Sequence, residues 1–221
     1  MARLARLCIP GHPHLVQQRG HNGQPVFLDE ADTQGFLRLL ADGAKASGVA
    51  VHAYGLAADE VHLLATPAAA DSLSRLMQAL GRQHGQAFNR RHARSGSLWD
   101  GRFRAVPIDG KQHLLAAMRY VESAAPDLLA SSAAHHLGQA VDHAVSDHPL
   151  YWALGNTPFD REMKYRAWFE QGTSSAEADR FRRAVTQGWP LGERAFIDDL
   201  SQLTSRRLAA RPRGRPPKAP L

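Results

Sequence analysis

Apolar residues in the N-terminal half of the chain recur at two alternating spacings. Apolar side chains at every second position are typical of half-buried strands, and spacings of three or four are typical of amphipathic helices. The strand pattern occurs in "RLCIPGHPHLVQQRG", which Pro10 and Pro13 break into two short runs, and in "VAVHAYGLA", "EVHLLAT" and "GRFRAVPI". The helix pattern occurs over about 31–47, from Asp71 or Ser72 onward, and in "KQHLLAAMRYVESA". The order β-α-β-β-α-β-α predicts an α+β protein, with a ferredoxin-like antiparallel sheet backed by helices.

Residues with special backbone preferences mark the boundaries of these elements. The pair Asn22-Gly23 suits a turn, because both residue types accept positive φ angles. Asp29 or Asp32 is a candidate N-cap for the first helix. A tight turn at 57–59 is expected to join two strands into an antiparallel hairpin.

The composition of the chain changes beyond the third predicted helix. We predict a core domain over 1–126, an Ala/Ser/His-rich connector over 127–148, a helical C-terminal extension over 149–208 and a basic tail over 209–221. The tail, "RPRGRPPKAPL", is too poor in apolar residues to pack, which predicts disorder.

Arginine dominates the charge of the protein. Lys and Arg number 27 against 21 Asp and Glu, and lysine occurs only four times, at 45, 111, 164 and 218. Guanidinium groups bind phosphates bidentately and stack on bases, which favours a nucleic-acid partner, although a GC-rich coding sequence would also enrich arginine. Cys8 is the only cysteine, so neither an intrachain disulfide nor a thiolate metal cluster is expected. Without a signal-peptide pattern or a long apolar run, we expect a cytoplasmic protein with no membrane partner and no small-molecule substrate.

The run "DEVHLLAT" raises a question about chemistry. In an extended strand Glu60 and His62 share one face, and Val61 and Leu63 share the other. A carboxylate beside an imidazole is one way to bind a metal ion, but it also suits the polar outer face of an edge strand. The pattern alone leaves both interpretations open.

A basic stretch with interleaved aromatic residues follows the second predicted helix. Cations that bind phosphates, mixed with rings that stack on unpaired bases, are typical of surfaces for single-stranded DNA. The alternative is that the aromatic residues belong to the core and the arginines to a solvated face. Trp99, in a Gly/Ser loop, is the better candidate for a base contact. The candidate DNA-binding residues are Arg82, Asn89, Arg90, Arg91, Arg94, Trp99, Arg102 and Arg104.

Two further features have both a specific functional interpretation and a non-specific one. "PRGRP" matches the core of an AT-hook, in which Arg213 and Arg215 would lie along an A·T minor groove; general attraction to phosphates would explain it equally well. The connector contains several histidines, but their irregular spacing lacks the paired pattern of a structural zinc site, which favours a surface connector. These histidines are His135, His136, His143 and His148.

Several stretches resemble, in order and spacing, blocks of one family. These are "ARLCIPGHPHLVQQRGHNGQPVF", "HAYGLAADEVHLLATP", "SLSRLMQALGRQHGQAFNRRHARSGSLWDGRF", "LLAAMRYVE", "HPLYWALG" and "RGRPPK". The chain is identified as similar to the REP-associated tyrosine transposases, in the single-tyrosine branch of the HUH nucleases. The resemblance implies a bacterial protein that cuts hairpin-forming single-stranded DNA through a 5′-phosphotyrosine intermediate, with Mg²⁺ or Mn²⁺ as cofactor.

The resemblance also assigns roles to particular residues. It places the nucleophile at Tyr120 in "MRYVE" and two metal ligands at Glu60 and His62, although the family has histidine at the first of these positions. The family's Asn, four residues after the tyrosine, is replaced by Ala124, which has no ligand atom. Glu122 lies about 200° around the helix from Tyr120, so we expect it to face away.

These departures leave three interpretations of function. The first is a transposase-family protein that binds hairpin-forming single-stranded DNA and cleaves it with a metal ion. The second is a DNA-binding descendant whose chemistry is weakened or lost. The third is an RNA-binding regulator on a ferredoxin-like sheet. The sequence does not fix the DNA target, the metal or the choice between monomer and dimer, although the helical extension favours a monomer.

Overall fold

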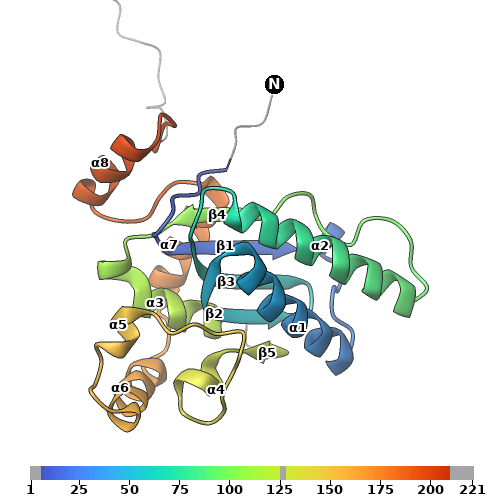
Figure 1. Ribbon diagram of the computed structural model, residues 1–221, viewed down its shortest axis with the longest axis horizontal. Helices are drawn as coiled ribbons and strands as arrows, with labels where there is room; N and C mark the ends of the chain where they lie inside the picture. The colour runs from blue at the N-terminus through green and yellow to red at the C-terminus, as the bar shows by residue number, and fades with distance from the viewer. Residues whose placement is uncertain (1–5, 125–127, 210–221) are drawn as a thin grey trace, which may run out of the picture.

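A five-stranded antiparallel sheet forms the centre of the molecule, in the order β4-β1-β3-β2-β5 (Figure 1). The structure is a computed structural model, and it describes residues 6–124 and 128–209. The strands are β1 (His14–Arg19), β2 (Val49–Ala57), β3 (Glu60–Pro67), β4 (Arg104–Pro107) and β5 (Ala130–Ser131). The predicted α+β fold, with helices packed on an antiparallel sheet, is confirmed.

Helices α1, α2 and α3 are the three that the apolar periodicity predicts. A short 3-10 helix, η1 (His21–Gly23), follows β1. The helices are α1 (Glu30–Ser47), α2 (Ser72–Arg91), α3 (Gly110–Glu122), α4 (Ala133–His136), α5 (Pro149–Trp152), α6 (Pro158–Glu170), α7 (Ser175–Gln187) and α8 (Arg194–Leu203). The order β-α-β-β-α-β-α therefore describes the chain up to α3.

The predicted boundary residues have the expected conformations. Asn22 and Gly23 have φ angles of 55° and 67°, as their turn requires. The side chain of Asp29 accepts a hydrogen bond from the amide of Asp32 at 3.0 Å, which caps α1. Ala57 of β2 pairs with Glu60 of β3, so the predicted tight hairpin is present.

The sheet buries apolar side chains on both of its faces. On one face α1 and α2 pack through residues such as Phe36 and Leu76. On the other face α3 packs together with α5, α6 and α7, and their shared cluster includes Tyr165 and Phe181. Full burial of a large apolar side chain contributes roughly 1.5–3 kcal/mol, so the C-terminal helices are part of the core that stabilises α3.

Helix α3 lies unusually close to the sheet. A Cβ atom at Gly55 of β2 would lie 2.2 Å from the carbonyl oxygen of Val121, which no side chain tolerates. Glycine at 55 therefore lets α3 approach the sheet, and this contact fixes the height of the α3 side chains above β3.

The connector over 127–148 departs from the surface segment that we expected. Leu56 and Gly55 of β2 pair with Ala130 and Ser131, so β5 extends the sheet edge. His136 is completely buried, because it packs against α3 and α6 instead of facing solvent. The expectation of a surface connector is therefore wrong at this residue.

Two expectations from the sequence stay untested, because they concern domain boundaries or residues outside the described ranges. The boundaries of the proposed domains stay predictions, and Arg213 and Arg215 lie outside the described residues. Across residues 6–124 and 128–209, no helix combines the length and the apolarity that crossing a lipid bilayer requires.

Candidate active site and DNA-facing surface

Strand β3 carries Glu60 and His62 on the face of the sheet that α3 covers. Alternate residues of a strand share a face, and Nε2 of His62 lies 2.8 Å from Oε1 of Glu60. Both side chains are only 10% exposed. Because β3 is the central strand of the sheet, the alternative of a polar edge strand is wrong.

Helix α3 brings Tyr120 to the same place. The rings of Tyr120 and His62 meet edge to face, with centroids 6.1 Å apart and an interplanar angle of 89°. Tyr120 and Glu60 are far apart in the sequence, yet the close packing of α3 on the sheet brings them together. The structure therefore gathers all three residues that the resemblance assigns to catalysis.

Strand β1 adds two residues that the sequence analysis missed. Gln17 stands opposite His62 and Arg19 opposite Glu60 in the antiparallel register. Nε of Arg19 donates to Oε2 of Glu60 at 2.9 Å, and the amide of Gln17 donates to Oε1. The register of β1 on β3 is the signal that would have found them, but it is a tertiary feature.

These contacts set the charge of the carboxylate. Burial raises the pKa of Glu60, but the hydrogen bonds from His62, Arg19 and Gln17 outweigh burial and lower the pKa to about 2. Glu60 is therefore ionised throughout the physiological pH range, as a metal ligand must be.

The Glu60–His62 pair fits two neighbouring positions around a divalent ion. Adjacent ligands of an octahedral ion at about 2.1 Å are roughly 3 Å apart, close to the observed nitrogen–oxygen distance of 2.8 Å. Among the His, Cys, Asp and Glu side chains in the described part of the chain, neither of the two groups of three possible ligands includes this pair. Ala124 follows α3, where the family has its asparagine. Water would have to complete the coordination of an ion here.

Helix α7 covers the phenol of Tyr120. The rings of Tyr120 and Phe181 lie 5.0 Å apart, and Tyr120 is only 6% exposed. Burial raises the pKa of Tyr120, so its hydroxyl is protonated at neutral pH. Arg119 of α3 holds α7 through a 2.7 Å ion pair with Glu177.

Glu122 faces away from Tyr120, as the helical geometry predicts. Its buried carboxylate accepts hydrogen bonds from Ser132, His136 and Tyr165, each at 2.6 Å. Glu122 therefore joins α3 to the connector and to α6, and it takes no part in the Tyr120 site.

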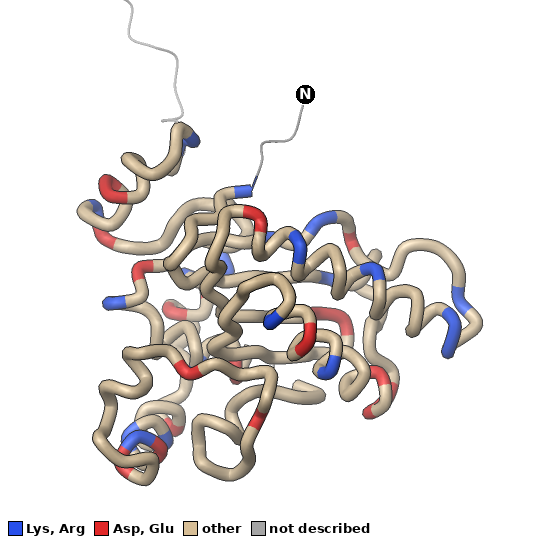
Figure 2. The backbone as a smooth tube through the Cα atoms, in the orientation of Figure 1, with Lys and Arg blue, Asp and Glu red and all other residues tan. Residues whose placement is uncertain are grey.

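A basic pocket of about 320 Å³ lies beside the site. Gln17 and Arg19 belong both to this pocket and to the surroundings of Glu60. Lys and Arg residues also occur along α2 and in the loop after it (Figure 2). The arginines that line the pocket are Arg6, Arg19, Arg102, Arg104 and Arg206.

The predicted DNA-binding residues fall into two groups. Arg82 and Arg90 of α2 are exposed, and so are Arg102 and Arg104 beside the basic pocket. Arg91 has a structural role instead, because its guanidinium pairs with two carboxylates at the start of α1, at 2.6 and 2.8 Å.

Asn89, Arg94 and Trp99 also make contacts within the protein. The amide of Asn89 donates to a carbonyl of the following loop, and Arg94 donates to Gln24. Trp99 is 8% exposed, and its indole N–H donates to the carbonyl of Gly81 at 3.1 Å. The structure therefore places Trp99 in the core, where its ring is not available to stack on a base.

One protein family and several solved structures are similar to this chain. The model of the IS200-like transposase family matches residues 12–124, slightly more than half of the chain. No curated protein matches the chain. The structure of a REP-associated tyrosine transposase bound to a REP hairpin is 15% identical, covers 55% of this chain and 71% of that one, and has a TM-score of 0.45. A candidate transposase from Deinococcus radiodurans is 23% identical, covers 52% of this chain and 91% of that one, and has a TM-score of 0.39.

The match over residues 12–124 defines the chain as a transposase-type protein. The chain belongs to the IS200-like transposase family, in agreement with the resemblance of its sequence blocks to transposases.

Proposed function

We propose that the protein binds hairpin-forming single-stranded DNA and cleaves it through Tyr120, as a member of the REP-associated branch of the family. The observation that carries the proposal is the convergence of Glu60, His62 and Tyr120 next to an arginine-lined pocket. Side chains from two elements that are far apart in the sequence, β3 and α3, meet there, which a purely structural role for any one of them would not require. The proposal includes a cytoplasmic location, where bacterial DNA lies.

The proposed reaction is a phosphoryl transfer from DNA to the protein. The Tyr120 hydroxyl attacks a phosphodiester, a bond forms between its oxygen and phosphorus, and the bond to the 3′ oxygen breaks. The phenol loses its proton and the leaving strand gains one as a 3′-OH, so the step balances. The reverse step, with another 3′-OH, rejoins DNA.

Glu60 and His62 would hold a Mg²⁺ or Mn²⁺ ion, which supplies polarisation of the scissile phosphate when it is bound. Arg19 anchors the Glu60 carboxylate, so that the orientation of this ligand is fixed before DNA arrives. Arg102 and Arg104 are exposed beside it and would bind the neighbouring phosphates.

A second candidate function is DNA binding without cleavage. Two observations favour it: Ala124 cannot act as the third ligand, and α7 covers the phenol of Tyr120. This form would keep the basic pocket and lose only the chemistry.

Electrophoresis under denaturing conditions separates the two functions. The protein is incubated with a labelled hairpin carrying a single-stranded flank and with Mn²⁺, and a covalent protein–DNA band is sought. Cleavage predicts a band that is absent with Tyr120→Phe and strongly reduced with His62→Ala. Anisotropy measurements with the same DNA should give unchanged binding by Tyr120→Phe. Binding without any band supports the second function. Tighter binding to an RNA hairpin of the same sequence, in competition with the DNA hairpin, would favour an RNA-binding regulator.

A further inference from the structure

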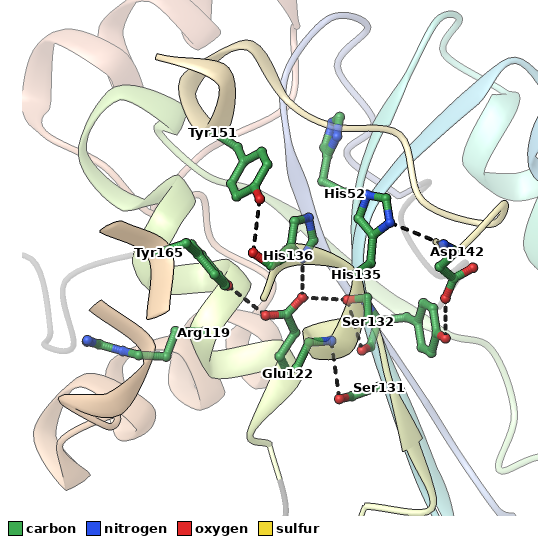
Figure 3. A network of polar contacts seen from close by, with 12 residues as sticks. His52, Arg119, Glu122, Ser131, Ser132, His135, His136, Asp142, Tyr151 and Tyr165 are labelled. Carbon is green, nitrogen blue, oxygen red and sulfur yellow. Dashed lines mark hydrogen bonds and ion pairs between the residues drawn. The ribbon is translucent and has the colours of Figure 1, made fainter. Parts of the chain in front are cut away.

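The far side of α3 carries a second cluster of titratable residues, which the transposase chemistry does not use. Figure 3 shows the carboxylate of Glu122 at its centre, contacted by Tyr165, His136 and Ser132. Glu122 and Tyr120 are on opposite faces of α3, so this cluster is separate from the Glu60–His62 pair.

His136 presents a nitrogen that the protein leaves without a partner. Its Nδ1 lies 2.6 Å from the Glu122 carboxylate, which accepts only, so Nδ1 carries the proton in this contact. The side chain is 0% exposed, and its Nε2 is a buried atom without a hydrogen bond. A buried polar atom without a partner is costly, and in a native site it indicates something that binds there.

Nε2 of His136 faces the carboxylate of Asp147. The distance from this nitrogen to Oδ1 of Asp147 is 3.7 Å, and Nε2 of His135 lies 3.2 Å from the same oxygen. Possible ligand atoms from all three residues lie within 4.8 Å of one another. Ligands about 2.0–2.1 Å from a tetrahedral ion are roughly 3.3 Å apart, so both distances to Asp147 suit a shared ion.

We propose that His135, His136 and Asp147 form a second metal site, for a divalent ion of the Zn²⁺ type. A donor set of two imidazoles and one carboxylate favours Zn²⁺ over Mg²⁺ or Ca²⁺. The Glu122 carboxylate behind His136 fixes the ring and its tautomer, as carboxylates behind metal-binding histidines do.

The fourth coordination position opens to a pocket. His135, Asp147, Tyr151 and Glu162 are among the residues that line a pocket of about 320 Å³. Water can therefore reach the ion and complete a tetrahedral shell. Since His136 ties the connector to α3 through Glu122, an ion held by His136 would stabilise this part of the molecule.

Coordination requires one local change at His135. Its Nδ1 accepts a hydrogen bond from the amide of Asp142 at 3.1 Å, which leaves the proton on Nε2. Binding through Nε2 moves this proton to Nδ1, and the Asp142 amide must then turn away. His136 and Asp147 need no such change, so they are the two primary ligands.

The other three-residue group in the described part of the chain gives a useful contrast. Asp29, Asp32 and His92 also gather possible ligand atoms. The guanidinium of Arg91 already pairs with both aspartates, at 2.6 and 2.8 Å. This cation satisfies the carboxylates, and no buried nitrogen there lacks a partner among the described residues.

Zn²⁺ titration of the metal-stripped full-length protein tests the second site. His62→Ala serves as the parent, so that the Glu60–His62 pair does not contribute. We expect this parent to bind one Zn²⁺ ion by calorimetry and to gain thermal stability from it. Adding Asp147→Asn should weaken the affinity at least tenfold and remove the gain, whereas adding His143→Asn, an exposed histidine in the same connector, should change neither.

His136→Asn provides a second test, because asparagine can still donate to Glu122 but has no ligand at the Nε2 position. Circular dichroism checks that each variant is folded. If His136→Asn unfolds, Asp147→Asn decides the test, because Asp147 lies at the surface of the cluster. Co²⁺ should give the intense visible bands of a tetrahedral site in the parent and not in Asp147→Asn. No Zn²⁺ binding by the parent, or equal binding by the parent and Asp147→Asn, would overturn the proposal. Neither outcome depends on whether DNA is cleaved.

Discussion

Glu60 stands where the family has a histidine, and its neighbours explain how a carboxylate is held there. Arg19 and Gln17 on β1 bind its two oxygens, and His62 lies beside it on β3. A histidine at 60 could not accept all of these hydrogen bonds. The carboxylate and Arg19 therefore form one unit, and the charge that this unit presents to DNA differs from that of two histidines.

The first prediction concerns the pH dependence that Glu60 causes. Its pKa falls from the ordinary 4.5 to about 2 on folding, so its stabilising effect is complete above about 4.5 and disappears as the pH falls toward 2. Urea unfolding should show Glu60→Gln to be less stable than wild type by about 1–2 kcal/mol at pH 7, after allowance for screening by solvent. Near pH 2.5 the difference should be much smaller. A difference that is constant with pH would show that the carboxylate is not held in this way.

The second prediction restores the missing ligand. Ala124→Asn places an amide oxygen at the position where the family has one, one turn after Tyr120. If the lost ligand limits ion binding, the rate of covalent adduct formation should rise about tenfold and the Mn²⁺ concentration needed should fall. Ser123→Asn, one position earlier, is the control. Equal rates in both variants would mean that Ala124 does not limit the reaction.

At the scale of elements, α7 covers the phenol of Tyr120, the proposed nucleophile. Phe181 lies on Tyr120, and the ion pair between Arg119 and Glu177 fastens α7 to α3. DNA can reach the phenol only if it passes alongside α7 or displaces it. The stability of the contact between α7 and α3 should therefore influence how fast the phenol reacts.

The third prediction tests this contact. Glu177→Gln leaves the buried guanidinium of Arg119 without its charged partner, which should cost about 1–3 kcal/mol. Hydrogen exchange should become faster in α7 and remain unchanged in α1. The control is Asp179→Asn, which removes an exposed pair with Arg182 on the same helix and should cost less than about 0.5 kcal/mol. Similar hydrogen exchange of α7 in the two variants would show that the ion pair between Arg119 and Glu177 does not hold α7 against α3.

The elements of the core could be predicted from local signals, whereas their C-terminal partners could not. Asp29 as a cap, the turn at Asn22-Gly23 and the periodicity of α1 act within a few residues, so the sequence shows them directly. The burial of His136 depends on Glu122, fourteen positions earlier in the chain, and on Tyr165 in α6. Such a polar network has no local signature, and a histidine in an Ala-rich segment therefore resembles a surface residue.

At the scale of the whole molecule, the basic pocket adjoins the Tyr120 site on the side of the sheet where α7 lies. Arg19 belongs to both, and Arg102 and Arg104 continue the positive surface along β4. Arg38 of α1 is exposed on the other face of the sheet. Charge on the two faces should therefore contribute very differently to DNA binding.

The fourth prediction uses this difference. Arg102→Ala should weaken binding to single-stranded DNA and reduce the slope of log K against log salt by about 0.7, as the loss of one phosphate contact does. Arg38→Ala, which removes the same charge from the opposite face, should leave both quantities nearly unchanged. Equal effects of the two substitutions would indicate attraction by net charge alone.

The candidate site could be predicted in part because each of its residues lies in a recognisable block. The shared face of Glu60 and His62 follows from strand alternation, whereas their proposed role as ligands, like that of Tyr120 as nucleophile, follows from the family resemblance. Gln17 and Arg19 could not be found, because only the pairing of β1 with β3 brings them to Glu60. Trp99 was expected at the DNA surface, but its indole N–H finds a partner in the carbonyl of Gly81, and its ring fills the core.

Mass-spectrometric mapping of the covalent adduct tests the central claim most directly. The protein is reacted with hairpin DNA and Mn²⁺, digested with nuclease and protease, and each peptide is searched for a retained nucleotide phosphate. Convergence of Glu60, His62 and Tyr120 into one active site predicts a nucleotide on the peptide with Tyr120 and a strongly reduced amount of it in the His62→Ala variant. An adduct on another tyrosine, or one on Tyr120 that forms equally well in His62→Ala, would contradict the account.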